Sequence, residues 1–372
     1  MIYLDHGATS FPKPQAVIRA AGRALQSCAN PGRGGYRQAM QAAETVYRTR
    51  ERAAAFFGCK PEQAVFTPGC TYGLNAAIAT LVAPGDKVAI SGFEHNAVTR
   101  PLHSLGAQIQ VCGREIFCWE SLLEDLEKAL KNGAKTAVFT HVSNVFGYIL
   151  PIEDIAALCR RYSAGLIIDA AQSAGILPLD FACLGADFIA IPGHKGLLGP
   201  QGVGLLLCAK PPKPLVMGGT GSESENQAMP ELLPERMEAG SLNVAGIAAL
   251  GEGIAQISRL GREAIRAREE KLARLCAHGL RELGLQVYAG AHQGGTVSFR
   301  GAFDCEELAT ALAEQGVAVR AGLHCAPLAH QSAGTLETGT VRISFGHSSH
   351  MRHLTGLLEA LKRCLPKMSA RS

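Results

Sequence analysis

Short apolar segments alternate with helix-forming segments through most of the chain, and this alternation restricts the possible folds more than any other feature of the sequence. Strands are predicted where short apolar runs are bounded by turn residues, at 65–67, 87–90, 108–111, 136–141, 166–169, 187–191 and 205–208. Helical spacing of apolar residues predicts helices before and between them, at 15–26, 38–57, 76–81, 122–130 and 152–162. Because near-continuous apolar strands are buried on both faces, the pattern predicts an α/β fold with a mainly parallel sheet covered by helices.

The last third of the chain has a different pattern, which predicts a smaller α+β unit. A helical run opens at 238–243 and continues to about 283, and we interpret it as the helix that links two domains. Further strands are predicted at 296–299, 317–320 and 341–344, helices at 306–314 and 350–364, and loops at 211–234 and 321–340. The length of 372 residues suits one large and one smaller domain. We place the large domain at residues 15–253 and the small domain at 1–14 together with 254–372.

Composition and charge argue against several classes of protein. The net charge of +4 comes from scattered residues, which is typical of solvated helix faces rather than a nucleic-acid site. No apolar run is long enough to span a bilayer, and the first residues lack the pattern of a secretory signal. The twelve cysteines include no Cys-x-x-Cys pair and lie mostly in apolar segments. We therefore expect a protein of the reducing cytoplasm with neither a nucleic-acid nor a membrane partner.

Three histidines near the C-terminus form the one pattern that suggests a metal. His347, His350 and His353 recur every third residue, and this spacing drifts around a helix. No carboxylate or cysteine beside them completes a ligand set. We therefore expect no metal site.

Polar residues follow the ends of several predicted strands. Ligands bind outside the carboxyl ends of parallel strands, so these residues are candidates for a site: His95, Asn144, Asp169, Gln172, His194 and Lys195. Lys195 lies in the glycine-rich turn 192–204 between two buried strands. A lysine in such partly desolvated surroundings loses its proton readily, and its amine can attack an aldehyde. The turn therefore indicates either a lysine that holds an aldehyde cofactor or an ordinary solvated lysine, and the turn alone does not decide between them.

Such a cofactor would need an acid partner for its ring nitrogen, a stacking group and donors for a phosphate. Asp169 could pair with the ring nitrogen or could simply cap a turn. Gln172 could reach a ring hydroxyl, and His95 could stack on the ring and shuttle protons. Thr71 lies in segment 68–75, whose N–H groups either bind an anion or belong to an ordinary helix cap. The residues alone leave these alternatives open.

Nine short motifs lie in order along almost the whole chain. They resemble the motifs of the class V aminotransferase group, which belongs to the fold-type-I enzymes that use pyridoxal 5'-phosphate (PLP). Within this group they are most similar to those of the cysteine desulfurases. They are YLDHGAT from Tyr3, TPGCTYGLN from Thr67, EHN from Glu94, HVSNVFG from His141, DAAQSAG from Asp169, GHKGLLGPQGVG from Gly193, EAGSLN from Glu238, RAGLHCAP from Arg320 and VRISFG from Val341. The short loop around Cys325 is similar to that of group-II desulfurases and selenocysteine lyases. The resemblance implies a large PLP-binding domain with a seven-stranded sheet and a smaller C-terminal α+β domain.

The resemblance implies a role for each residue around the cofactor ring. Lys195 would bind PLP covalently, and Asp169 would pair with the pyridine nitrogen. Gln172 would contact the phenolic oxygen, and His95 would stack on the ring.

The resemblance also implies a phosphate site. Cys70, Thr71 and His194 would hold the phosphate, and Ser241 would reach the phosphate of a neighbouring subunit, which requires a homodimer. Many relatives carry serine or threonine where this chain has Pro192. Because proline has neither a hydroxyl nor an N–H, the phosphate site has one donor fewer.

At the substrate end, the resemblance implies that Asn144 and Arg342 bind the amino-acid group, with Arg320 near the same end. The arginine would grip the carboxylate through two parallel hydrogen bonds. Cys325 would attack the sulfur of L-cysteine, and the products would be L-alanine and a persulfide that passes to an acceptor. From the residues alone, Cys325 could be this nucleophile or a spectator thiol like the other eleven cysteines, and its place on a loop next to His324 and near Arg320 favours the nucleophile.

The leading hypothesis is therefore a PLP-dependent cysteine desulfurase. A second hypothesis keeps the cofactor and changes the reaction, to a selenocysteine lyase acting on L-selenocysteine, another β-elimination or an aminotransferase. A third is a PLP-binding scaffold without activity, and the intact Lys195, Asp169 and Arg342 argue against it.

Overall fold

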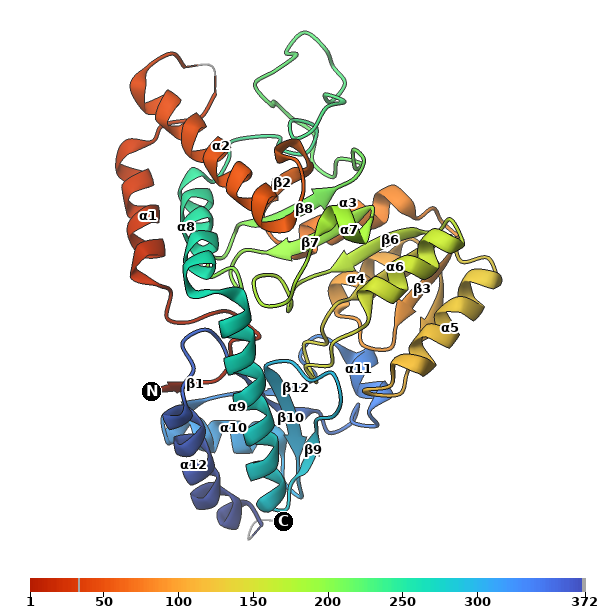
Figure 1. Cartoon of the computed structure of the whole chain (residues 1–372), viewed down its shortest axis with the longest axis vertical. Coiled ribbons are helices and arrows are strands. Elements are labelled where there is room, and N and C mark those ends of the chain that lie inside the picture. Colours follow the sequence, from red (N-terminus) through yellow and green to blue (C-terminus); the bar gives the residue numbers. More distant parts are fainter. Residues whose placement is uncertain (33, 370–372) are drawn as a thin grey trace.

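A seven-stranded sheet forms the centre of the larger part of the molecule. The computed structural model describes residues 1–32 and 34–369 (Figure 1). The strand order is β2-β8-β7-β6-β5-β3-β4, with β2 Ala64–Thr67, β3 Lys87–Ser91, β4 Gln108–Cys112, β5 Thr136–Thr140, β6 Gly165–Asp169, β7 Phe188–Pro192 and β8 Gly204–Cys208. Strand β8 is antiparallel to both of its neighbours, and the other pairs are parallel. The predicted mainly parallel sheet is confirmed.

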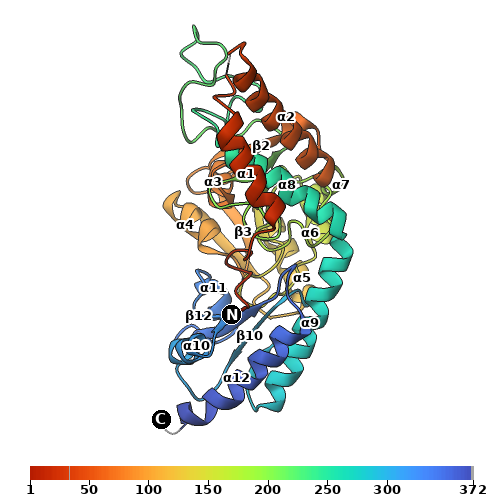
Figure 2. The same ribbon diagram turned by 90° about the vertical axis from the view of Figure 1, so that its left-hand side faces the viewer.

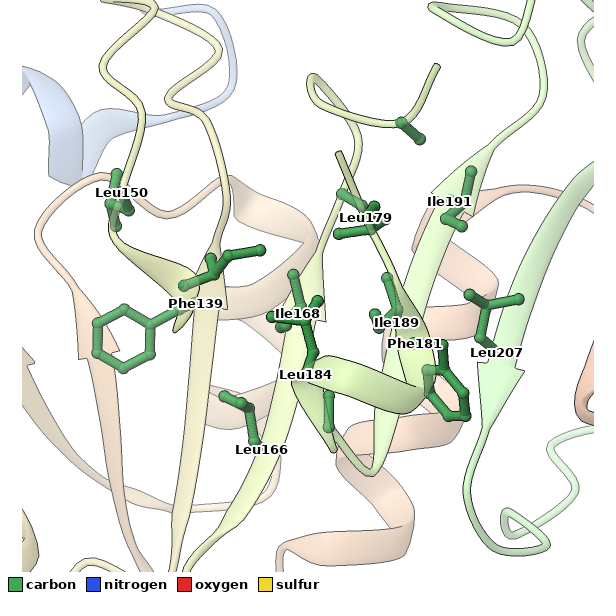
Figure 3. Packing of buried hydrophobic residues seen from close by; sticks show 14 of the residues in the cluster. Phe139, Leu150, Leu166, Ile168, Leu179, Phe181, Leu184, Ile189, Ile191 and Leu207 are labelled. Atoms are coloured by element: carbon green, nitrogen blue, oxygen red, sulfur yellow. The ribbon is translucent and has the colours of Figure 1, made fainter. Parts of the chain in front are cut away.

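Helices cover both faces of this sheet because its strands are apolar on both sides. Successive residues of a strand point to opposite faces, so Ile168 and Ile189 belong to one core cluster while Ile167 and Phe188 belong to another. Figure 3 shows part of the first cluster, which runs along the sheet from Phe139 of β5 to Leu207 of β8 and includes Phe181. The helices of this part are α1 Gln15–Ser27, α2 Arg37–Phe57, η1 Pro61–Gln63, α3 Cys70–Leu81, α4 Asn96–Ser104, α5 Trp119–Lys131, α6 Ile152–Arg161, α7 Phe181–Leu184 and α8 Val244–Leu260.

A second sheet with its own core lies in the C-terminal part (Figures 1 and 2). Its antiparallel strands have the order β12-β13-β10-β9, and its elements are α9 Arg262–Glu282, β9 Gln286–Tyr288, β10 Thr296–Arg300, α10 Cys305–Glu314, β12 Arg320–Gly322, α11 Pro327–Ser332, β13 Thr340–Ser344 and α12 Met351–Ser369. The N-terminal arm joins this core, because Leu4 is fully buried in it and β1 (Ile2–Tyr3) pairs with β11 (Val317–Ala318). The α+β character is confirmed, and the domain boundaries at 15–253 and at 1–14 with 254–372 stay a prediction.

The predicted continuous helix up to residue 283 is wrong. The structure has two helices, α8 and α9, with Gly261 between them. Gly261 has a φ of +81°, a left-handed value that glycine adopts without strain and that ends a helix. Helix α9 then continues into the C-terminal part (Figure 1).

Other predicted bounds also need correction. Helix α3 begins at Cys70 and not at residue 76, because the polar residues and glycine of its first turns interrupt the apolar spacing. The predicted strand 317–320 is two short strands, β11 and β12, in different sheets. The predicted loop 321–340 contains α11, a helix too short for apolar periodicity to reveal.

A buried ion pair connects α2 to the segment before α8. Arg50 and Glu238 form two parallel bonds, Nη1 to Oε1 and Nη2 to Oε2, each of 2.7 Å. Their side chains are 7% and 6% exposed. Oε1 of Glu238 also accepts the backbone N–H of Phe66 at 2.7 Å. Loss of one partner would leave the other charge buried and uncompensated.

We therefore expect Glu238→Gln to lower the free energy of unfolding by about 3 kcal/mol or more. Glu44→Gln is the matched control, because Glu44 pairs with Arg48 at the exposed surface. Such exposed pairs contribute about 1 kcal/mol or less. Urea denaturation measures both variants, and equal losses would contradict the prediction.

Candidate active site

A cavity of about 670 Å³ lies at the carboxyl ends of β5, β6 and β7, and the N-terminal arm and the C-terminal part complete its lining. Every predicted site residue except Ser241 lines it: Cys70, Thr71, His95, Asn144, Asp169, Gln172, His194, Lys195, Arg320, Cys325 and Arg342. Ser241 is exposed and lies outside this cavity. The fold thus brings together residues that are far apart in the sequence.

Lys195 lies on the tight turn between β7 and β8. Glycine is required next to it, because a Cβ at Gly196 would collide with the backbone carbonyl of Ala174. Burial lowers the pKa of Lys195, and the charge of Asp169 offsets part of this shift. A larger fraction of the amine is therefore uncharged and nucleophilic than in an exposed lysine.

Asp169 is the last residue of β6 and is 2% exposed. Its Oδ1 accepts the backbone N–H of Ala171 at 2.8 Å and the thiol of Cys70 at 3.4 Å. Burial, and after it the charge of Asp169, raises the pKa of Cys70, so Cys70 remains a thiol that donates to the carboxylate. The Cys70 side chain is thus engaged with Asp169, which leaves its backbone N–H for the predicted contact with a phosphate.

The start of α3 offers donors to the cavity through Cys70 and Thr71. The first N–H groups of a helix lack partners within it and carry partial positive charge, and the first turn of α3 contains no acidic residue. His194 adds an imidazole whose buried Nδ1 has no hydrogen-bond partner among the residues described. Burial lowers the pKa of His194 to about 4. Pro192 lines the same cavity without a donor, and the remaining donors fit a phosphate.

His95 and Gln172 each have one polar group already bonded. Nδ1 of His95 accepts the backbone N–H of Ala97 at 3.0 Å, which places the ring proton on Nε2. Burial lowers the pKa of His95, which favours the neutral ring. Nε2 of Gln172 donates to the carbonyl of Gly7 at 2.9 Å and keeps a second amide hydrogen for a ligand.

Asp5, which was not among the predicted site residues, lies between the two predicted substrate arginines. Its Oδ1 accepts from Nη2 of Arg342 at 2.6 Å, and its Oδ2 accepts from Nε of Arg320 at 3.1 Å. Arg342 is 2% exposed, and its Nη1 donates to the carbonyl of Asn144 at 3.0 Å. Its buried Nε has no hydrogen-bond partner within the described chain. Two arginines and one aspartate leave a net positive charge, which suits a substrate carboxylate.

Cys325 is exposed on a loop that lines the cavity. Its φ is +57° and that of His324 is +50°, left-handed values that cost on the order of 1 kcal/mol each outside glycine. Two hydrogen bonds hold this loop: Asn96 N–H to the Cys325 carbonyl and Asn144 Nδ2 to the His324 carbonyl, both at 2.8 Å. Strained backbone fixed in this way is typical of functional sites.

A second cavity, of about 50 Å³, is lined by Lys195, Gln172 and Glu269, among other residues. Glu269 is 3% exposed, and burial raises its pKa to about 8. At pH values between the pKa that Glu269 has in the unfolded chain and this raised pKa, the folded state keeps a proton that the unfolded state releases. The free energy of unfolding therefore falls as pH rises through this range.

We expect Glu269→Gln to remove this pH dependence. The variant should be close to the wild type in stability near pH 5 and more stable by on the order of 3 kcal/mol near pH 8. Denaturant titrations at the two pH values measure the difference. Glu270→Gln is the control, since Glu270 is partly exposed and pairs with Arg266 at 2.6 Å. A stability gain of the same size at both pH values would contradict the prediction.

The structure describes residues 1–32 and 34–369. No helix in these ranges is long and apolar enough to cross a membrane. No three His, Cys, Asp or Glu side chains in them are grouped so that they could hold a metal ion.

Comparison with known proteins places the chain in a family. The sequence pattern of the family Aminotransferase class-V matches residues 2–356. Probable cysteine desulfurases of Methanothermobacter thermautotrophicus and Pyrococcus abyssi are 31% and 32% identical to this chain, over 97% and 98% of it and 94% and 95% of their own lengths. The solved apo structure of the cysteine desulfurase from Thermococcus onnurineus NA1 is similar with a TM-score of 0.91 at 31% identity, covering 98% of this chain and 95% of that one. The chain therefore belongs to the aminotransferase class-V family.

Proposed function

We propose that this chain is a PLP-dependent cysteine desulfurase, which converts L-cysteine to L-alanine and retains the sulfur as a persulfide on Cys325. One observation carries the proposal: a single cavity is lined by Lys195, Asp169, Arg342 and Cys325, which come from separate segments of the chain. The names of the similar proteins support the same reaction.

The residues of the cavity fit PLP. Thr71, His194 and the start of α3 would hold the phosphate, Asp169 would pair with the ring nitrogen, and Lys195 would bind the aldehyde carbon. When bound, PLP supplies an electron sink that weakens the bonds at the α and β carbons of an amino acid. Ser241, which is exposed, would contribute to the phosphate site of the second subunit in a homodimer.

The side chains of the protein would perform the other steps. Arg342 and Asn144 would hold the substrate carboxylate, and Nζ of Lys195 would accept and return a proton at the α-carbon. Sγ of Cys325 would attack the substrate sulfur, so that an S–S bond forms and the C–S bond breaks. The electron pair of the C–S bond would stay on the carbon, which takes up a proton and becomes the methyl group of alanine.

The persulfide would then pass to a thiol acceptor. We place this reaction in the cytoplasm, because buried free thiols such as Cys159, Cys208 and Cys276 suit a reducing compartment.

Product analysis tests the proposal. With L-cysteine and a reductant, the purified protein should form L-alanine and sulfide in equal amounts. Pyruvate as the product would indicate β-elimination, and dependence on a keto acid would indicate transamination; either result would contradict the proposal. A parallel assay with L-selenocysteine identifies a lyase if only the selenium compound is turned over.

A further inference from the structure

Cys325 also lines a surface groove of about 390 Å³, separate from the two cavities described above, between the start of α3 and one side of α4. Thr71, His95, Ala97 and Cys325 border both this groove and the main cavity. The cysteine therefore lies where the two spaces meet. A sulfur received from the main cavity is thus within reach of a molecule bound in the groove.

The loop of Cys325 is fixed to the wall of this groove. The backbone N–H of Asn96, the first residue of α4, donates to the Cys325 carbonyl at 2.8 Å. Asn96 and Ser104 line the groove on the same helix. The position of the thiol relative to α4 is therefore set by a direct hydrogen bond.

The charge of the groove is positive. Arg100 lines the groove, is exposed and supplies this charge. The lining residues include no aspartate or glutamate. Arg100 forms no ion pair or hydrogen bond with the rest of the described chain. The other polar groups of the lining include the amides of Asn75 and Asn96 and the hydroxyl of Ser104. An unpaired guanidinium beside neutral polar groups suits a ligand that carries a carboxylate.

We propose that this groove binds the sulfur acceptor, and that the acceptor is a low-molecular-weight thiol that carries a carboxylate. The size of the groove is in the range of small-molecule sites. The inference rests on the proposed function, because it needs a persulfide on Cys325. The acceptor thiolate attacks the outer sulfur, a new S–S bond forms on the acceptor, and the bond to Sγ of Cys325 breaks. Cys325 leaves as a thiolate and the proton stays on the transferred sulfur, so that no oxidant or reductant is needed.

The test separates loading of the sulfur from its transfer. The PLP-loaded enzyme is first treated with one equivalent of L-cysteine, and alanine and the persulfide are measured, the latter by intact mass. Unreacted substrate is removed, and decay of the persulfide is followed with 3-mercaptopropionate, 2-mercaptoethanol or cysteamine at equal thiolate concentrations. These probes are anionic, neutral and cationic respectively.

We expect the anionic thiol to remove the persulfide sulfur from Cys325 about fivefold faster than the neutral one, the effect of about 1 kcal/mol from one exposed ion pair. Arg100→Gln should remove this preference, Arg100→Lys should keep part of it, and the control Arg19→Gln, at an exposed site on α1, should keep all of it. Equal rates with the three thiols, or a preference that survives in Arg100→Gln, would overturn the proposed groove. Failure to form alanine and persulfide in the first step would instead overturn the proposed function.

Discussion

Cys325→Ser is expected to abolish the formation of alanine from L-cysteine, with a loss on the order of 10⁴-fold or more, the scale for removal of an enzyme's nucleophile. A neutral hydroxyl is a poor nucleophile towards sulfur, so the C–S bond of the substrate has no acceptor for its sulfur. The yellow colour of bound PLP should remain, because Cys325 is not among the groups that we assign to the cofactor.

Cys183→Ser is the matched control for this variant. Cys183 is also exposed, and it lies in the short helix α7, outside the cavity. The control should turn over cysteine at the wild-type rate. Full turnover by Cys325→Ser would contradict the mechanism, and turnover of selenocysteine alone would favour a lyase.

Asp169→Asn should lower the rate of alanine formation by about 10² to 10³-fold, the usual loss for one preorganised electrostatic partner. The amide oxygen can still accept the hydrogen bonds from Ala171 and Cys70, so the substitution removes mainly the negative charge. Without that charge the ring nitrogen has no partner that keeps it protonated. The visible spectrum of the bound cofactor should change together with the rate.

Asp187→Asn provides the control for Asp169→Asn. Asp187 lies just before β7, outside the cavity, where it accepts the backbone N–H of Leu166 at 2.8 Å and pairs with Lys210. Its replacement should leave both the spectrum and the rate unchanged. If Asp169→Asn also kept the wild-type spectrum and rate, the assigned role of Asp169 would be wrong.

The central sheet was predictable from the sequence because burial on both faces makes each strand a continuous apolar run. The break at Gly261 was not predictable in the same way. The apolar residues before and after it have the spacing of a single continuous helix. The early start of α3 at Cys70 had no apolar signal. The separation of β11 from β12 depends on which strands they pair with, and local sequence does not carry that information.

The candidate site was predictable in its parts, because its residues follow strand ends or lie in family motifs. Asp5 was missed although it lies in the motif YLDHGAT, because its partners Arg320 and Arg342 are 315 and 337 residues away in the sequence. The bond between the Cys70 thiol and Asp169 was missed for the same reason. Such long-range pairs are set by tertiary packing, and no local pattern reveals them.

Lys13 is a second lysine that could be tested as the residue that holds the cofactor. Its Nζ donates to the carbonyl of His194 at 2.7 Å, and burial lowers its pKa to about 8. A second amine with a lowered pKa therefore lies next to the residue that precedes Lys195. A measurement that distinguishes the two lysines decides which one holds the cofactor.

Borohydride reduction followed by peptide mass spectrometry is that measurement. Borohydride converts the double bond between a lysine amine and an aldehyde carbon into a stable single bond. After reduction and denaturation of the PLP-loaded enzyme, we expect the cofactor to stay attached and to be found on the peptide that contains Lys195. Its recovery on Lys13, or its complete loss on denaturation, would contradict the role proposed for Lys195.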